Sequence, residues 1–189
     1  QRYLSKFVYE ASLRGQGLDY RLTLRSLPLR TGTNPLTFGI PTSDPFPFVI
    51  DCATSTNQRG KIEMYERAGK STPRGCVVDV NGIERTDTSG ILRDMVAGTC
   101  ALTPVGGAGI DTAGYKGYGW ATAVELLCTA VQSGPWGADV CGVDRKTGKP
   151  APMPLGHFFM AVDLEPLVPV ETFKNNAGKL LQALRGSRK

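Results

Sequence analysis

A lysine in a glycine-rich stretch is the first group in this sequence whose position suits chemistry. Lys116 stands among glycines between Gly106 and Gly119, directly before an apolar run that reaches Val131 and stops at Gly134. The start of a helix carries unpaired N–H groups and a positive dipole end, and glycine lets a ligand approach the backbone. The stretch therefore favours an anionic ligand such as a phosphate or a carboxylate. Glycines before a helix also serve tight packing alone, and the residue types leave both interpretations open.

Two further polar residues stand beside apolar runs. Asp51 follows the run Phe46–Ile50, and ligand sites favour such strand ends, where a carboxylate can accept a proton or orient a substrate. Taken by itself, Asp51 is more simply explained as the cap of the next helix. Asn34 lies in the turn Gly32–Pro35, where its side chain can donate and accept hydrogen bonds. A plain turn is the simpler explanation of that stretch in isolation.

Histidine and cysteine usage limits metal and redox chemistry. The one histidine, His157, precedes the apolar run Phe158–Val162 and serves either as a ligand contact or as a satisfied core histidine. A histidine-rich metal site is therefore excluded within this chain, and no metal is predicted. The cysteines are odd in number, and no two of them form a CxxC pair. They predict reduced thiols in a reducing compartment, the cytoplasm or an organellar matrix, rather than a disulfide framework. The five are Cys52, Cys76, Cys100, Cys128 and Cys141.

The elements that must position these residues are both helices and strands, so we predict an α/β fold: a layered mixed sheet, partly antiparallel, with helices on its faces. Strands are predicted at Arg21–Arg25, Leu36–Ile40, Phe46–Ile50 and Phe158–Val162, with a hairpin turn at Asn81–Gly82. Helices are predicted at 3–13, from a Ser55 or Thr56 cap to Gly69, at 88–97, from Trp120 to Val131, and from a Thr172 cap onward. The helix from Trp120 is apolar on nearly every face, which predicts a buried central helix.

Length and composition are those of an ordinary globular protein. The chain has 189 residues, with 41% hydrophobic and 21% charged side chains, which fits one domain or a domain with an appendage. Its net charge of +5 comes from scattered basic residues, which argues against a nucleic-acid partner. No apolar run is long enough to span a membrane, and we expect no membrane partner. Neither the dinucleotide-binding G-x-G-x-x-G fingerprint nor a P-loop is present.

Several stretches, taken together and in order, resemble one family. They are Gly32–Leu36; Ile50–Ser55; Arg59–Glu63; Asp79, Asn81 and Gly82; Pro104–Gly107; Gly114–Gly119 with Val124, Glu125 and Leu126; and Gly156–Phe159. With these motifs, residues 31 to 185 resemble the malate/L-lactate dehydrogenase family, which includes sulfolactate and ureidoglycolate dehydrogenases. Several independent motifs in the right order are specific where any one of them is weak.

The resemblance implies a non-Rossmann oxidoreductase that transfers a hydride between NAD or NADP and a 2-hydroxy or 2-keto acid such as malate or lactate. It implies that the cofactor supplies the hydride chemistry and the protein supplies position and charge. By the same resemblance, Asp51 and Lys116 are the catalytic candidates. The cofactor contacts that it implies are Thr33, Asn34, Pro35, Lys116, Gly117, Gly156, His157 and Phe158.

The resemblance also implies a division of the chain. Residues 31–189 are expected to form the cofactor-binding domain with its C-terminal helix, after an unmatched segment, 1–30, that holds a helix and a strand. The family's N-terminal part supplies the proton-shuttling histidine, whereas His157 lies in a different motif. Three expectations follow: the C-terminal part of a longer enzyme, one half of a split enzyme completed by a second chain, or a non-catalytic structural subunit. The family implies a homodimer.

Overall fold

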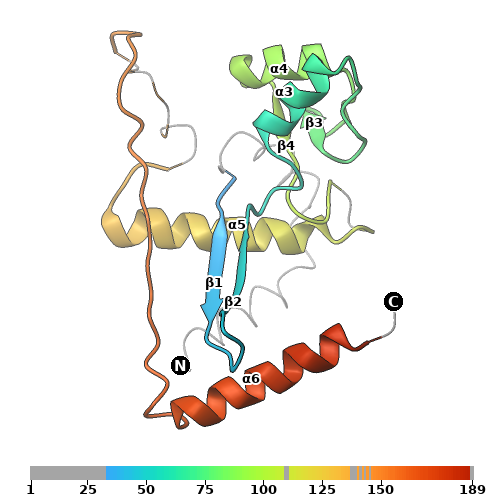
Figure 1. The fold of residues 1–189 in the computed structure, drawn as a ribbon. Coiled ribbons are helices and arrows are strands. Elements are labelled where there is room, and N and C mark those ends of the chain that lie inside the picture. Colours follow the sequence, from blue (N-terminus) through green and yellow to red (C-terminus); the bar gives the residue numbers. More distant parts are fainter. Residues whose placement is uncertain are drawn as a thin grey trace.

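The computed structural model describes residues 33–108, 111–136, 140, 142, 144 and 146–187. Two regions are evident in Figure 1: a compact unit of short elements, and an open arrangement of two long helices crossed by extended polypeptide. The predicted helix at 3–13 and the predicted strand Arg21–Arg25 lie outside the described residues, as does the segment 1–30. In the part of the chain that the structure describes, no helix is both long and apolar enough to span a bilayer.

The compact unit packs two helices against a two-stranded sheet (Figure 1). It consists of α3 (Arg59–Arg67), β3 (Val77–Asp79), α4 (Thr88–Ala97) and β4 (Cys100–Leu102). The strands β3 and β4 pair antiparallel, from Val77 opposite Leu102 to Asp79 opposite Cys100. Ile62, Val77, Ile91 and Cys100 form the buried core between them. The unit therefore has a small hydrophobic core of its own.

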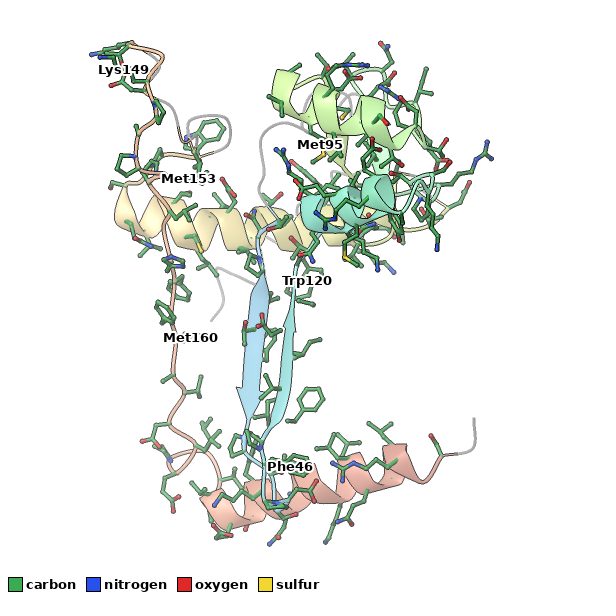
Figure 2. All side chains as sticks on the ribbon, turned by 45° about the horizontal axis from the view of Figure 1, so that its top comes forward. Phe46, Met95, Trp120, Lys149, Met153 and Met160 are labelled. Carbon is green, nitrogen blue, oxygen red and sulfur yellow. The ribbon has the colours of Figure 1, made fainter. Side chains whose placement is uncertain are left out.

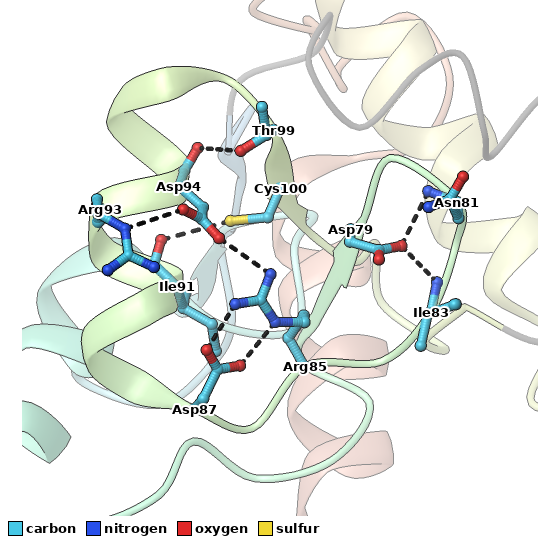
Figure 3. Close-up of polar contacts among 10 residues, drawn as sticks. All are labelled: Asp79, Asn81, Ile83, Arg85, Asp87, Ile91, Arg93, Asp94, Thr99 and Cys100. Atoms are coloured by element: carbon cyan, nitrogen blue, oxygen red, sulfur yellow. Dashed lines mark hydrogen bonds and ion pairs between the residues drawn. The ribbon is translucent and has the colours of Figure 1, made fainter.

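Local sequence explains where several of these elements begin and end. The predicted helix over 88–97 is confirmed, and it ends at Gly98, whose φ of 72° is the left-handed conformation that glycine adopts readily at a helix end. The predicted turn at Asn81–Gly82 is also present, because the amide of Gly82 donates to the carbonyl of Asp79 at 3.0 Å. The carboxylate of Asp79 accepts hydrogen bonds from the amides of Asn81 and Ile83, which fixes the loop (Figure 3).

The second region, which we call the open frame, begins with a hairpin. Its strands are β1 (Leu36–Ile40), where the prediction is confirmed, and β2 (Phe48–Cys52). They pair antiparallel, from Leu36 opposite Cys52 to Ile40 opposite Phe48. Each of the two sheets among the described residues has two strands. The predicted class, helices with partly antiparallel strands, is confirmed, and all strand pairs described here are antiparallel.

Two long helices and an extended segment complete the open frame (Figure 1). The helix α5 (Gly114–Thr129) continues into the short 3-10 helix η2 (Ala130–Gln132), and α6 (Val170–Arg185) lies at the other end of the hairpin. Residues 156–163, which we call the arm, run from α5 toward the start of α6 without forming a strand. The predicted strand Phe158–Val162 is therefore wrong as secondary structure, because no neighbouring strand pairs with it among the described residues.

Three predicted boundaries are wrong for identifiable reasons. Strand β2 is displaced by two residues, so Asp51 lies within the strand and not after it. The residue before α3 is Gln58, not Ser55 or Thr56, because residues 54–56 bond to Thr33 and to residues 103–105 instead. Thr172 lies inside α6, which Pro169 precedes.

The central helix also differs from the prediction. It starts at Gly114 rather than Trp120, so that the glycine-rich stretch forms its first turns. Its buried residues are Gly114, Gly117, Ala121 and Val124, whereas Leu126 is 58% and Val131, just beyond it, 65% exposed. The expectation of a helix buried on nearly every face is therefore wrong for this chain, because α5 is packed on one side only.

Candidate functional site

The glycines around the start of α5 bring backbone against backbone. A Cβ atom added to Gly117 would lie 2.0 Å from the carbonyl oxygen of Val105, and one added to Gly106 would lie 2.8 Å from the backbone of Ala113. Gly106 has a φ of 96°, which side-chain-bearing residues rarely adopt. These two glycines thus let the loop after β4 pack directly on the helix. The sequence left a ligand-binding role and a packing role open for these glycines, and packing accounts for both Gly106 and Gly117.

Lys116 lies in the first turn of α5 and is exposed. Its backbone amide donates to the carbonyl of Ala113 at 3.0 Å, and its Nζ lies 5.9 Å from the centre of the Tyr115 ring. The ammonium group therefore adds a full charge to the positive end of the helix dipole in a position open to solvent. Gly117, the next residue, is buried against Val105.

Asn34 joins the hairpin to the middle of α5. Its Nδ2 donates to the carbonyl of Ala121 at 3.0 Å and to the carboxylate of Glu125 at 2.7 Å. The φ of Asn34 is 40°, in the left-handed region that asparagine tolerates better than most residues. The neighbouring Thr54 hydroxyl donates to the carbonyls of Thr33 and Asn34, both at 3.1 Å. Thr33 and Pro35 are exposed on either side of this clamp.

Asp51 belongs to the second residue pair of the hairpin, counted from the end at which Asn34 lies. It is exposed, opposite Thr37, whose hydroxyl donates to its carboxylate at 2.7 Å. Asp51 therefore neither caps the next helix nor lies beyond the strand end, because it lies within β2 and contacts the opposite strand. A solvent-facing carboxylate in this place remains able to accept a proton or to bond a ligand.

The predicted segment Gly156–Phe158 docks on the other end of α5. A Cβ atom at Gly156 would lie 1.9 Å from the carbonyl oxygen of Cys128, so that only glycine fits there. The side-chain amide of Gln132 bonds to the carbonyls of both Cys128 and His157. His157 is exposed, and Phe158 is 39% exposed. The lone histidine is therefore not a core residue.

The predicted contact residues that the structure ties to α5 do not meet at one point. Lys116 is near its first residue, the Asn34 clamp is at its middle, and Gly156 is at its end. Glu125 follows Lys116 by nine residues, about two and a half turns, so these two side chains leave opposite sides of the helix. Lys116 and Cys128 are about 18 Å apart along the axis, at 1.5 Å per residue. The helix brings the Asn34 and Gly156 groups onto one scaffold and leaves Lys116 at a distance.

Sequence reasoning missed a cluster of charges in the compact unit (Figure 3). The Arg85 guanidinium bonds to both carboxylate oxygens of Asp87 and, at 3.0 Å, to Asp94. The hydrogen bonds with Asp87 and Asp94 raise the pKa of Arg85, and the bond from Arg85 lowers the pKa of Asp87. The signal in the sequence was an arginine two residues before an aspartate that precedes a helix. The backbone amide of Arg85 also donates to the carbonyl of Val77 in β3 at 2.9 Å, so the cluster ties β3 to α4 and its role is structural.

The cysteines differ in exposure. Cys52 is exposed, whereas Cys100 is buried, and its thiol donates to the carbonyl of Ile91 at 3.4 Å. Burial, with a contribution from the nearby Asp94 charge, raises the pKa of the Cys100 thiol to about 11. The four described cysteines are free thiols, and Cys141 lies outside the described residues. A buried thiol with a raised pKa is a poor nucleophile, so Cys100 serves packing.

Comparison with known proteins gives this geometry its context. The sequence profile of malate/L-lactate dehydrogenase matches residues 26–189. A malate dehydrogenase from Pyrococcus horikoshii is 34% identical over 158 residues, 84% of this chain and 41% of that protein. A Δ1-pyrroline-2-carboxylate/Δ1-piperideine-2-carboxylate reductase from Pseudomonas aeruginosa is 45% identical over 96 residues, 51% of this chain and 25% of that protein.

A solved structure shows the same fold. The crystal structure of malate dehydrogenase from Entamoeba histolytica is similar with a TM-score of 0.75 at 31% identity, over 85% of this chain and 44% of that one. The chain therefore spans less than half the length of these relatives, and it matches their C-terminal part. The profile covers far more than half of the chain, and it confirms the resemblance inferred from the ordered motifs. The chain belongs to the malate/L-lactate dehydrogenase family.

Proposed function

We propose that this chain is the cofactor-binding part of an oxidoreductase that transfers a hydride between NAD or NADP and a small 2-hydroxy or 2-keto acid such as malate or lactate. The observation that carries the proposal is the 34% identity to a malate dehydrogenase over 158 residues. The substrate class follows from the relatives' names, since malate and pyrroline-2-carboxylate both carry a carboxylate beside the carbon that exchanges hydride. The complete enzyme is expected to be a cytoplasmic homodimer.

The residues beside α5 fit an anionic dinucleotide. Lys116 offers an exposed ammonium at the positive end of the helix, where a phosphate or substrate carboxylate is stabilised. Gly156 and the exposed His157 form an irregular segment about 18 Å along the same helix, a separation that an elongated cofactor can bridge and a small acid cannot. The cofactor supplies the hydride chemistry when bound, and the protein orients it.

The remaining roles fall to exposed groups of the hairpin. Thr33 and Pro35 present the turn that is expected to contact the cofactor, and Asp51 presents a carboxylate that can orient the substrate. Proton transfer to the substrate oxygen needs a further group, which we assign to the part of the dehydrogenase fold outside the match. His157 is a poor candidate because it lies in the cofactor segment.

A second candidate function is a non-catalytic relative that serves as a structural subunit. The favouring observation is that the one histidine in the sequence, His157, lies exposed where the arm begins, beside Gln132 and at the end of α5 away from Lys116. This alternative predicts fixed partner proteins and no turnover of 2-hydroxy acids. Oxidation of malate or lactate by the purified protein with its partners would exclude it.

The test uses the chain and a single-chain chimera in which residues 26–189 replace the matching part of the Pyrococcus horikoshii malate dehydrogenase. Calorimetry with NADH and with NADPH should show binding to the chimera. Lys116→Met should weaken that binding about 10- to 100-fold, since a hydrogen bond to a charged group contributes about 1.5–3 kcal/mol. Lys149→Met, on an exposed loop, is the matched control. A folded chimera that binds neither cofactor would contradict the proposal.

A further inference from the structure

The hairpin and the arm connect the same two helices. At one end, Asn34 bonds the hairpin to α5, and Gly156 packs the arm against Cys128 of α5. At the other end, the amide of Ser43 in the hairpin tip donates to the carbonyl of Lys174 in α6, and the arm leads directly into that helix. Figure 1 shows the two running between the helices as separate extended pieces. The hairpin and the arm therefore both run between α5 and α6, and no strand pairing joins them among the described residues.

Polar contacts fix the α6 end of the hairpin firmly. Arg185 of α6 forms an ion pair with Asp44 at 2.7 Å, and its guanidinium lies 5.9 Å from the Phe46 ring. A Cβ atom on Gly178 would lie 1.9 Å from the hydroxyl of Ser43, so the tip sits directly on the helix. Figure 2 shows Phe46 at this junction. The described contacts that hold the open frame together thus lie where its extended segments meet α5 and α6, and not along the length of those segments.

Among the described residues, no further strand pairs with the edges of either piece. Neither β1 nor β2 pairs with a third strand in the described part of the chain. For residues 158–162, no backbone–backbone hydrogen bond is found to any described residue. An extended segment in this state presents a row of N–H and C=O groups ready to pair with another strand.

The side chains on these pieces are apolar and exposed. Because side chains alternate along a strand, one face of the hairpin carries six apolar residues: Leu36, Phe38, Ile40, Phe48, Ile50 and Cys52. On that face Phe38 is 48% and Ile50 43% exposed. On the arm, Phe159 is 89% and Met160 76% exposed, and Figure 2 shows Met160 standing clear of both helices.

These edges lack the features by which proteins protect a permanently free strand. Natural free edges carry lysine, proline, inward-pointing charges or bulges. The arm sequence from Phe158 to Val162 is Phe-Phe-Met-Ala-Val, and in β1 and β2 the only charged residue is Asp51. The sequences of the hairpin and the arm therefore favour burial of their edges over exposure to water.

We infer that the free edges of the hairpin and the arm are a docking surface for β-strands of the dehydrogenase polypeptide that lies outside the matched region. The lengths of the relatives favour this occupant, since the matched region is less than half of each of those chains. Strand addition satisfies the unpaired backbone groups, and the added side chains cover the apolar face. The inference rests on the fold and goes beyond the proposed activity.

Hydrogen exchange tests the inference on the full chain and on the chimera described above. In the isolated chain, the amides of residues 158–162 should exchange as in an unprotected peptide. In the chimera, the same amides should exchange at least about 100-fold more slowly, because they would then open only with the sheet. Protection of these amides in the isolated monomer would overturn the inference. Protection that appears only in a homodimer of the chain would do the same, because the occupant would then be a second copy.

A pair of substitutions separates docking from general stability. Phe159→Lys should lower the melting temperature of the chimera and remove the arm's protection, while leaving the isolated chain unchanged. Val96→Lys, at a position 73% exposed on α4, should change neither protein. If Phe159→Lys changed neither the melting temperature of the chimera nor the protection of the arm, the inference would be contradicted. Arm protection in a chimera that binds no nicotinamide cofactor would support docking while contradicting the proposed function, so the two failures are distinguishable.

Discussion

The compact unit and the open frame contain similar apolar side chains and bury them very differently. In the compact unit Ile62, Val77 and Ile91 are completely buried, whereas in the open frame Phe159 is 89% exposed. The compact unit is built from residues 59–102, so neighbouring elements close around one core. The open frame is joined by polar contacts between distant residues, of which Arg185 and Asp44 are the extreme case. The difference teaches that elements close in sequence bury a core in one region, whereas the other region holds distant segments together and leaves its apolar side chains exposed.

The largest effect is expected from emptying the core of the compact unit. Ile91→Ala should reduce the free energy of unfolding by about 3 kcal/mol, the transfer and cavity cost of a fully buried isoleucine. Val131→Ala, at a position 65% exposed beyond α5, should change it by less than about 0.5 kcal/mol. Urea denaturation of the two variants measures both values. Equal losses would show that the two regions are stabilised alike.

An intermediate effect is expected where the two regions meet. Gly117→Ala places a Cβ atom 2.0 Å from the Val105 carbonyl oxygen, so α5 must move, at a cost of about 1–3 kcal/mol. Gly119→Ala, two residues along the same helix, meets nothing within 4 Å and should stabilise the helix by about 0.5–1 kcal/mol. Thermal unfolding compares them. If both variants were stabilised, the close contact between α5 and the loop after β4 would be disproved.

The smallest effect concerns the charges that tie β3 to α4. Arg85→Met should reduce the free energy of unfolding by about 1 kcal/mol at pH 7, since its partners are partly exposed. Arg85 lowers the pKa of Asp87 below its ordinary value of 3.8, so folding favours the ionised carboxylate. Its stabilisation is therefore complete above about pH 4 and is lost as the pH falls below that value.

Urea midpoints measured from pH 7 down to pH 3 should consequently fall less steeply for Arg85→Met than for the unchanged protein. Arg59→Met, which removes an exposed pair with Glu63 on α3, should shift stability by only a few tenths of a kcal/mol at every pH. Parallel pH curves for all three proteins would remove the assigned link between Arg85 and Asp87.

Local signals in the sequence predicted one helix and one turn of the compact unit well. The helix over 88–97 and the turn at Asn81–Gly82 follow from apolar spacing and from glycine at positions of positive φ. Strand β1 was predicted with its observed bounds. The ordered motifs identified the family, which the comparisons confirmed. The roles of Asp51, Lys116 and the cofactor segment stay predictions.

The errors concentrate in the open frame, where partners are distant. An apolar run such as Phe158–Val162 reads as a strand, but a strand exists only when a neighbour pairs with it. Asp51 was placed after β2 because apolar residues end at Ile50, yet cross-strand pairing with Thr37 extends the strand past it. The apolar run from Trp120 predicted burial on nearly every face, whereas the buried residues of α5 lie on one side of it.

The sequence by itself determined which segments are helical or extended, where glycine ends them, and which family the motifs resemble, because these depend on residue types and short spacings. Only the tertiary structure decided that Asn34 clamps the hairpin to Glu125 and that Gly117 admits the Val105 backbone. It also placed Lys116 on the side of α5 opposite Glu125. Such contacts join residues far apart in the chain. Their geometry depends on how whole elements pack, which no local pattern encodes.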